Sequence, residues 1–159
     1  MNGSKLDELL RMVNPNRYAV TEDWRARVEE ALSKLKADRM ALILEAKDRY
    51  EELTYRERKT VGYLLTLEAE EQTKARGLFE VGDLCSGLDY AFVEARGVKV
   101  RGDTARHFCG FKAKDSVFVF REVGYGFLSH SVNCTGVVGR AGLNAGFKAV
   151  NCKLIIQTP

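Results

Sequence analysis

Proline is scarce in this 159-residue chain, which has only Pro15 and Pro159. Because proline removes a backbone donor and interrupts regular elements, the interval between the two can form uninterrupted helices and sheets. Long apolar runs are also missing, and none approaches the roughly 20 residues that cross a bilayer. The first residues do not form the hydrophobic region of a signal peptide. We therefore expect a cytoplasmic protein that does not insert into membranes.

Cysteine is sparse, and its spacing excludes two common kinds of small fold. Cys85, Cys109, Cys134 and Cys152 are far apart, and no two of them form a CxxC pair. Zinc ribbons and disulfide-dense scaffolds depend on closely spaced cysteines. We expect four reduced thiols.

Charge is distributed unevenly along the chain. The net charge is only +3, but the two halves differ in sign. Residues 1–96 carry 16 Lys or Arg and 19 Asp or Glu, whereas residues 97–159 carry nine and three. The second half is therefore the part expected to attract anions.

The first half has the apolar spacing of α-helices, about four in number. A stripe that Thr21 can cap begins at Trp24 and continues through Val28, Leu32 and Leu35. The segment 54–57, Thr-Tyr-Arg-Glu, has the form of a capping box and predicts a helix that ends near Gly77. Residues 5–13 form a weaker amphipathic stretch. A last helix is predicted over 83–96, where it would cap the end of a following sheet.

The second half contains a repeat of 18 residues. Segments 112–120, 130–138 and 148–156 align so that five columns agree in residue type. The columns are Ala113/Ser131/Ala149, Asp115/Asn133/Asn151, Ser116/Cys134/Cys152, Val119/Val137/Ile155 and Phe120/Val138/Ile156. Nine glycines lie between Gly97 and Gly146, as frequent turns require.

This repeat predicts a parallel β-solenoid, because small residues, an Asx column and β-branched residues at a fixed period let each coil bury its apolar positions against the next. We expect an α+β chain with a helical segment over 1–96 and a solenoid of about three 18-residue coils over 97–159. An antiparallel β-sandwich or barrel with fortuitous matches is the alternative.

A solenoid would leave the edge of its last coil open. That coil carries Val150, Leu154, Ile155 and Ile156. An uncovered strand of this composition favours pairing with another chain. The leading hypothesis is therefore a non-catalytic structural or interaction protein that forms a homo-oligomer or binds a partner protein through this edge.

A basic face of the second half suggests another function, the binding of nucleic acid or another polyanion. The repeat places Lys112, His130 and Lys148 in one column. Further cations near it in sequence are Lys114, Arg121, Arg140 and Lys153. A charged exterior that only maintains solubility is the competing interpretation.

A metal site is a further possibility. His107, Cys109, His130 and Cys134 are of the types that bind zinc. However, the column of His130 contains lysines, and the column of Cys134 contains Ser116 and Cys152, so the two columns are expected to face opposite ways. No motif specifies a reaction, and the sequence favours a protein that is not an enzyme and has no cofactor.

Overall fold

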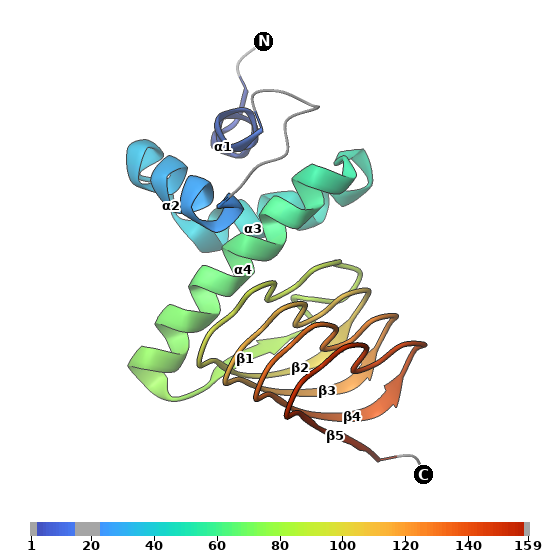
Figure 1. Cartoon of the computed structure of the whole chain (residues 1–159). Helices are drawn as coiled ribbons and strands as arrows, with labels where there is room; N and C mark the ends of the chain where they lie inside the picture. Colours follow the sequence, from blue (N-terminus) through green and yellow to red (C-terminus); the bar gives the residue numbers. More distant parts are fainter. Residues whose placement is uncertain (1–2, 15–22, 158–159) are drawn as a thin grey trace.

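The computed structural model describes residues 3–14 and 23–157. Four α-helices precede a parallel five-stranded sheet that winds as a β-solenoid of about four turns (Figure 1). The helices are α1 (Lys5–Val13), α2 (Trp24–Leu35), α3 (Arg39–Asp48) and α4 (Tyr55–Arg76), with a short 3-10 helix at Tyr50–Glu52. The strands are β1 (Phe79–Gly82), β2 (Lys99–Ala105), β3 (Val117–Val123), β4 (Thr135–Ala141) and β5 (Lys153–Ile156).

Helix α1 is the weak amphipathic stretch, and it is docked in the core. Ser4 and Asp7 form a capping box at its start, which satisfies free backbone amides. The guanidinium of Arg49, just after α3, binds the Asp7 carboxylate at 3.0 Å. The apolar face of α1 is buried, through Leu6, Leu9, Leu10 and Val13.

Helix α4 begins and ends as its sequence predicts. Thr54 accepts from the Glu57 amide, the Glu57 side chain accepts from the Thr54 amide, and Gly77 ends the helix in the left-handed conformation. Residues 60–69 of α4 are buried, which makes it the central helix of the fold. The predicted cap of α2 at Thr21 lies outside the described residues, and α2 begins after Asp23.

The strands stack at the predicted period of 18. Lys99, Val117, Thr135 and Lys153 are partners in successive strands, and the other pairs from β2 to β5 keep the same offset. The strand order is β1-β2-β3-β4-β5, with every neighbouring pair parallel. The α+β solenoid is therefore confirmed, and an antiparallel sandwich or barrel is not formed.

The Asx column forms a ladder of side chains. The Asn133 amide donates to Asp115 at 3.2 Å, and the Asn151 amide donates to Asn133 at 2.5 Å. All three residues have φ between 52° and 55°, a conformation that Asx side chains tolerate at turns. The ladder supports the turn in each coil where the chain enters the following strand.

The prediction of a helix over 83–96 is wrong. These residues are the turns of a first coil that starts with β1, and Tyr90, Phe92 and Glu94 have positive φ, which an α-helix cannot accommodate. Their backbones instead bond to the next coil, as in the Tyr90 amide donating to the His107 carbonyl at 2.8 Å. In the sequence, Ala95 indicates that this segment belongs to the repeat, because it lies 18 residues before Ala113 and extends that column by one period.

Helices α4 and α2 cover the end of the solenoid that the predicted helix over 83–96 was expected to cap. Thr66 donates to the Val93 carbonyl at 2.7 Å, Glu70 accepts from the Arg96 amide at 3.0 Å, and Thr73 accepts from the Lys99 amide at 3.1 Å. From α2, Arg25 donates to the Glu94 carbonyl at 3.3 Å. Side chains thus bond backbone groups that a preceding coil would otherwise pair.

At Gly62, α4 lies directly against the backbone of the first coil. A Cβ atom there would clash with the Tyr90 carbonyl group, whose carbon would lie 3.0 Å away. We predict that Gly62→Ala destabilises the protein by about 1–3 kcal/mol, because overpacking outweighs the better helix propensity of alanine. Denaturant unfolding measures this. Ser33→Ala on the exposed face of α2 is the control and should be neutral or slightly stabilising; equal stability of both variants would contradict the prediction.

Candidate functional site

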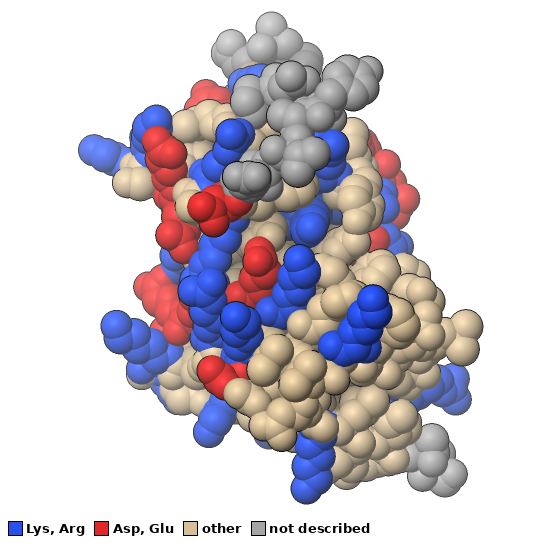
Figure 2. Space-filling view, viewed as in Figure 1, with Lys and Arg blue, Asp and Glu red and all other residues tan. Residues whose placement is uncertain are grey.

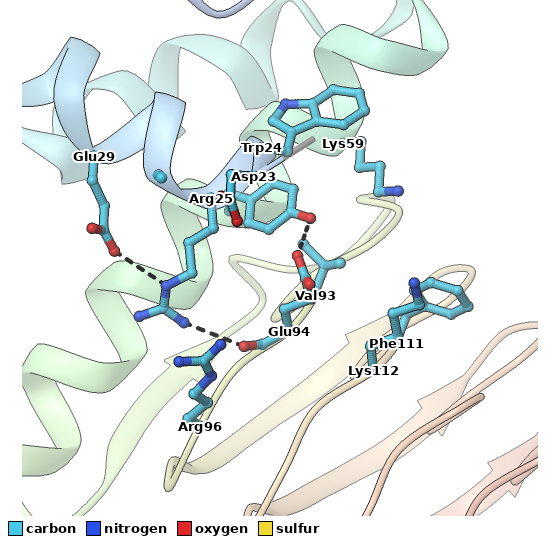
Figure 3. Close-up of a pocket in the computed structure, with 12 residues that line it drawn as sticks. Asp23, Trp24, Arg25, Glu29, Lys59, Val93, Glu94, Arg96, Phe111 and Lys112 are labelled. Carbon is cyan, nitrogen blue, oxygen red and sulfur yellow. Dashed lines mark hydrogen bonds and ion pairs between the residues drawn. The ribbon is translucent and has the colours of Figure 1, made fainter. Parts of the chain in front are cut away.

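A cleft lies where the helices meet the first coils, and we call it the junction cleft. Its main part has a volume of about 470 Å³, and an adjoining hollow of about 350 Å³ shares Glu94, Arg96 and Lys112 with it. Figure 2 shows a band of Lys and Arg side chains in this region of the surface. The helices contribute Trp24, Lys59 and Tyr63, and the coils contribute Glu94, Phe111 and Lys112 (Figure 3).

Lys59 is the unusual cation of this cleft. Its ammonium group lies over three aromatic rings, 5.1 Å from the centroid of Trp24, 5.4 Å from Tyr90 and 5.9 Å from Phe111. Among the described residues, none forms a hydrogen bond or an ion pair with it. Burial, with a further contribution from the nearby charge of Lys112, lowers the pKa of Lys59.

The principal carboxylates near Lys59 are already engaged by other groups. Tyr63 donates its hydroxyl to the Glu94 carboxylate, and burial together with this hydrogen bond raises the pKa of Tyr63. Arg25 pairs with Glu29 at 3.1 Å and also bonds Glu70. The cations Lys59 and Lys112 are therefore brought together without a carboxylate dedicated to either.

The predicted basic column is stacked as expected from the repeat. The Lys112 amide donates to the Ser129 carbonyl, and the His130 amide donates to the Phe147 carbonyl, so positions 112, 130 and 148 occupy equivalent places in three coils. The His130 ring lies between two aromatic rings, with centroids 5.3 Å from Phe111 and 5.8 Å from Phe147. All three members of the column are exposed.

The remaining predicted anion-binding residues divide into two groups. Lys114 lines the hollow together with Arg96, Lys112 and His130, so it joins the column. In contrast, Arg121, Arg140 and Lys153 lie in the strands β3, β4 and β5. The Arg121 guanidinium is paired with the Asp103 carboxylate at 2.7 Å. The seven residues therefore do not share one surface.

The candidate zinc ligands lie in different surroundings. His107 is exposed and its Nδ1 accepts from the Tyr125 amide, whereas Cys109 is fully buried. His130 is exposed and its Nδ1 lies 3.2 Å from the hydroxyl of the buried Ser129, and Cys134 is buried beside Cys152, with its amide 3.4 Å from the Cys152 sulfur. Within residues 3–14 and 23–157, no three His, Cys, Asp or Glu side chains are grouped to hold a metal ion.

The last coil, residues 143–156, exposes several large apolar side chains, and we call it the terminal coil. The exposed fractions are 61% for Val150, 37% for Ile155 and 47% for Ile156. Phe147 is 48% exposed in the same coil, and Leu154 is only partly buried. In Figure 2 the surface over the last coils is mostly uncharged, with isolated Lys and Arg side chains projecting from it.

Sequence reasoning did not identify Lys59 and Trp24 as site residues. Both occupy ordinary positions in amphipathic helices, and nothing in their spacing indicates that α2 and α4 bring them against the coils. The approach of Phe111 to Lys59 depends on how the helices pack on the solenoid. Only the coil side of the cleft, through Lys112 and His130, was indicated by the repeat.

Comparison with known proteins gives no family model that matches the chain, and no significant match among curated proteins or solved structures. In the part of the chain that the structure describes, no helix has the length and apolar character needed to span a bilayer. The junction cleft and the terminal coil are therefore the features of the molecule that bear on its function.

The four cysteines are free thiols in very different environments. Burial raises the pKa of the Cys85 thiol to about 12 and the pKa of Cys109 well above its ordinary value. Burial also raises the pKa of Cys134. Cys152 alone of the four is partly exposed.

We predict that in dilute native protein at pH 8 one thiol reacts rapidly with a disulfide reagent such as DTNB, because the buried thiols carry little thiolate. Cys152→Ser should remove the rapid phase, and Cys134→Ser should leave it intact. Unfolding in denaturant should release all four thiols. Rapid labelling of Cys109 in the folded protein would contradict this assignment.

Proposed function

We propose that the protein is a non-catalytic assembly subunit that forms a homodimer by pairing its terminal coil with that of a second copy. The observation that carries this proposal is the asymmetry between the two ends of the solenoid. Side chains of α2 and α4 bond the backbone of the first coil and the start of β2. No described residue does the same for the terminal coil.

Among the described residues, backbone amides of the terminal coil lack the acceptors that the equivalent amides have in the interior coils. In the interior coils, the His130 amide donates to the Phe147 carbonyl at 2.8 Å and the Asn133 amide to the Val150 carbonyl at 3.0 Å. The equivalent amides of Lys148 and Asn151 have no following coil among the described residues. Within the part of the chain that the structure describes, strand β5 likewise has β4 as its single neighbour in the sheet. A second strand beside β5 would supply acceptors and cover Ile155.

A second copy is the occupant that this geometry favours. Since α4 covers the other end of the solenoid, head-to-tail stacking would have to displace a core helix, whereas contact between two terminal coils uses the same open surface twice. A twofold axis makes the paired β5 strands antiparallel. With the axis between Leu154 and Ile155, each Lys153 lies opposite an Ile156, so the like charges are not opposed.

The free thiols support the reducing cytoplasm as the compartment.

Size-exclusion chromatography with light scattering tests the proposal. We expect the wild-type protein to be dimeric at micromolar concentration. Val150→Lys combined with Ile155→Lys should raise the dissociation constant at least about tenfold, equivalent to roughly 1.4 kcal/mol, because unpaired ammonium groups would be buried at the contact.

Leu44→Lys is the matched control, because Leu44 is 50% exposed on α3, away from the terminal coil. It should leave the dimer unchanged. Thermal unfolding of both variants establishes that they remain folded. A wild-type protein that stays monomeric across the micromolar range would refute self-pairing, and so would a dimer that tolerates both lysines.

A further inference from the structure

We propose that the junction cleft binds a small phosphomonoester, with the phosphate group between the ammonium groups of Lys59 and Lys112. This site involves neither β5 nor the exposed apolar residues of the terminal coil, so the inference is independent of assembly. It differs from the basic column expected along the solenoid, because Lys59 comes from the helical segment.

Two unpaired cations approach each other in the cleft. Lys59 is partly buried, its ammonium group lies 5.9 Å from the centroid of the Phe111 ring, and the ammonium group of Lys112 lies 5.6 Å from the same centroid. In the described part of the chain, neither ammonium group has a carboxylate within ion-pair distance. Bringing two like charges together costs electrostatic free energy. An anion with two or more oxygens between the two ammonium groups would replace this repulsion with attraction.

The adjoining hollow, like the space between Lys59 and Lys112, is lined mainly by positively charged groups. Arg96, Lys114 and His130 line it together with Lys112, and Glu94 is its acidic lining residue. The Arg96 and Lys114 side chains, within the described residues, have no acidic partner. Lysine is a common phosphate ligand in proteins because its ammonium group is a compact charge with three donors.

The acidic residues of the cleft oppose the field of these positive groups only in part. The Glu94 carboxylate keeps its negative charge while it accepts from Tyr63, and that charge raises the pKa of Lys59 against the effect of burial, whereas Glu29 is paired with Arg25. Asp23 lies at the N-terminus of α2, where the positive end of the helix dipole balances a negative charge.

The size of the cleft indicates an ester and not a free phosphate ion. Its volume of about 470 Å³ falls within the range of small-molecule pockets, which is roughly 300–1,000 Å³. Trp24 and Phe111 are only partly buried and flank Lys59, so they offer apolar walls to the organic part of a ligand (Figure 3).

Isothermal titration calorimetry with adenosine monophosphate tests the proposal, with ribose 5-phosphate, inorganic phosphate and adenosine as comparison probes. We expect both esters to bind more tightly than inorganic phosphate, and adenosine to bind at least about tenfold more weakly than its monophosphate. Lys59→Gln and Lys112→Gln should each weaken binding of the monophosphate at least about tenfold. Tighter binding of adenosine monophosphate than of ribose 5-phosphate would support contact of the base with the aromatic walls.

Lys74→Gln is the control, because Lys74 is an exposed lysine in the same helix as Lys59. It should change the affinity less than twofold. Lys112 is exposed, so its variant tests the site even if Lys59→Gln is unstable. The proposal is overturned if no ester binds at millimolar concentration, or if adenosine binds as well as its monophosphate. Binding of single-stranded oligonucleotide without binding of the monophosphate would also overturn it, in favour of an extended polyanion surface.

Discussion

Backbone pairing between parallel coils is the constraint on which this structure depends. Each coil donates to and accepts from both neighbours, so the stack is satisfied in its interior and must be completed at its two ends. At the first end, Thr66, Glu70 and Thr73 of α4 bond the free groups with side chains. The helical segment is therefore part of the solenoid's own bonding, and the two halves of the chain form one structural unit.

That closure also creates the junction cleft. Glycine at position 62 lets α4 lie against the backbone at Tyr90, and this approach carries Lys59 to the turns of the coils. The turns present Phe111 and Lys112 because the left-handed residues of each coil recur every 18 positions. A cation from a helix and a cation from a coil consequently share one concave surface. The same packing that protects one edge produces the most distinctive electrostatic feature of the molecule.

The two ends of the solenoid differ in chemistry as well as in bonding. The covered end carries ion pairs, such as Arg25 of α2 with Glu70 of α4 and Arg58 of α4 with Asp89 of the first coil. The terminal coil has two lysines and no acidic residue, and its apolar side chains are half exposed. Selection against aggregation usually protects such edges, and the proposed homodimer would cover this one.

The sequence by itself determined the coil period, the Asx ladder, the capping box of Thr54 and the stop at Gly77, because each of these depends on residues at fixed local spacing. It did not determine the fate of residues 83–96: their apolar pattern suits a helix, and only pairing with the next coil selects turns at Tyr90, Phe92 and Glu94. The site at Lys59 was likewise decided by tertiary structure, because the contact of a helix with a solenoid joins residues that no sequence spacing relates.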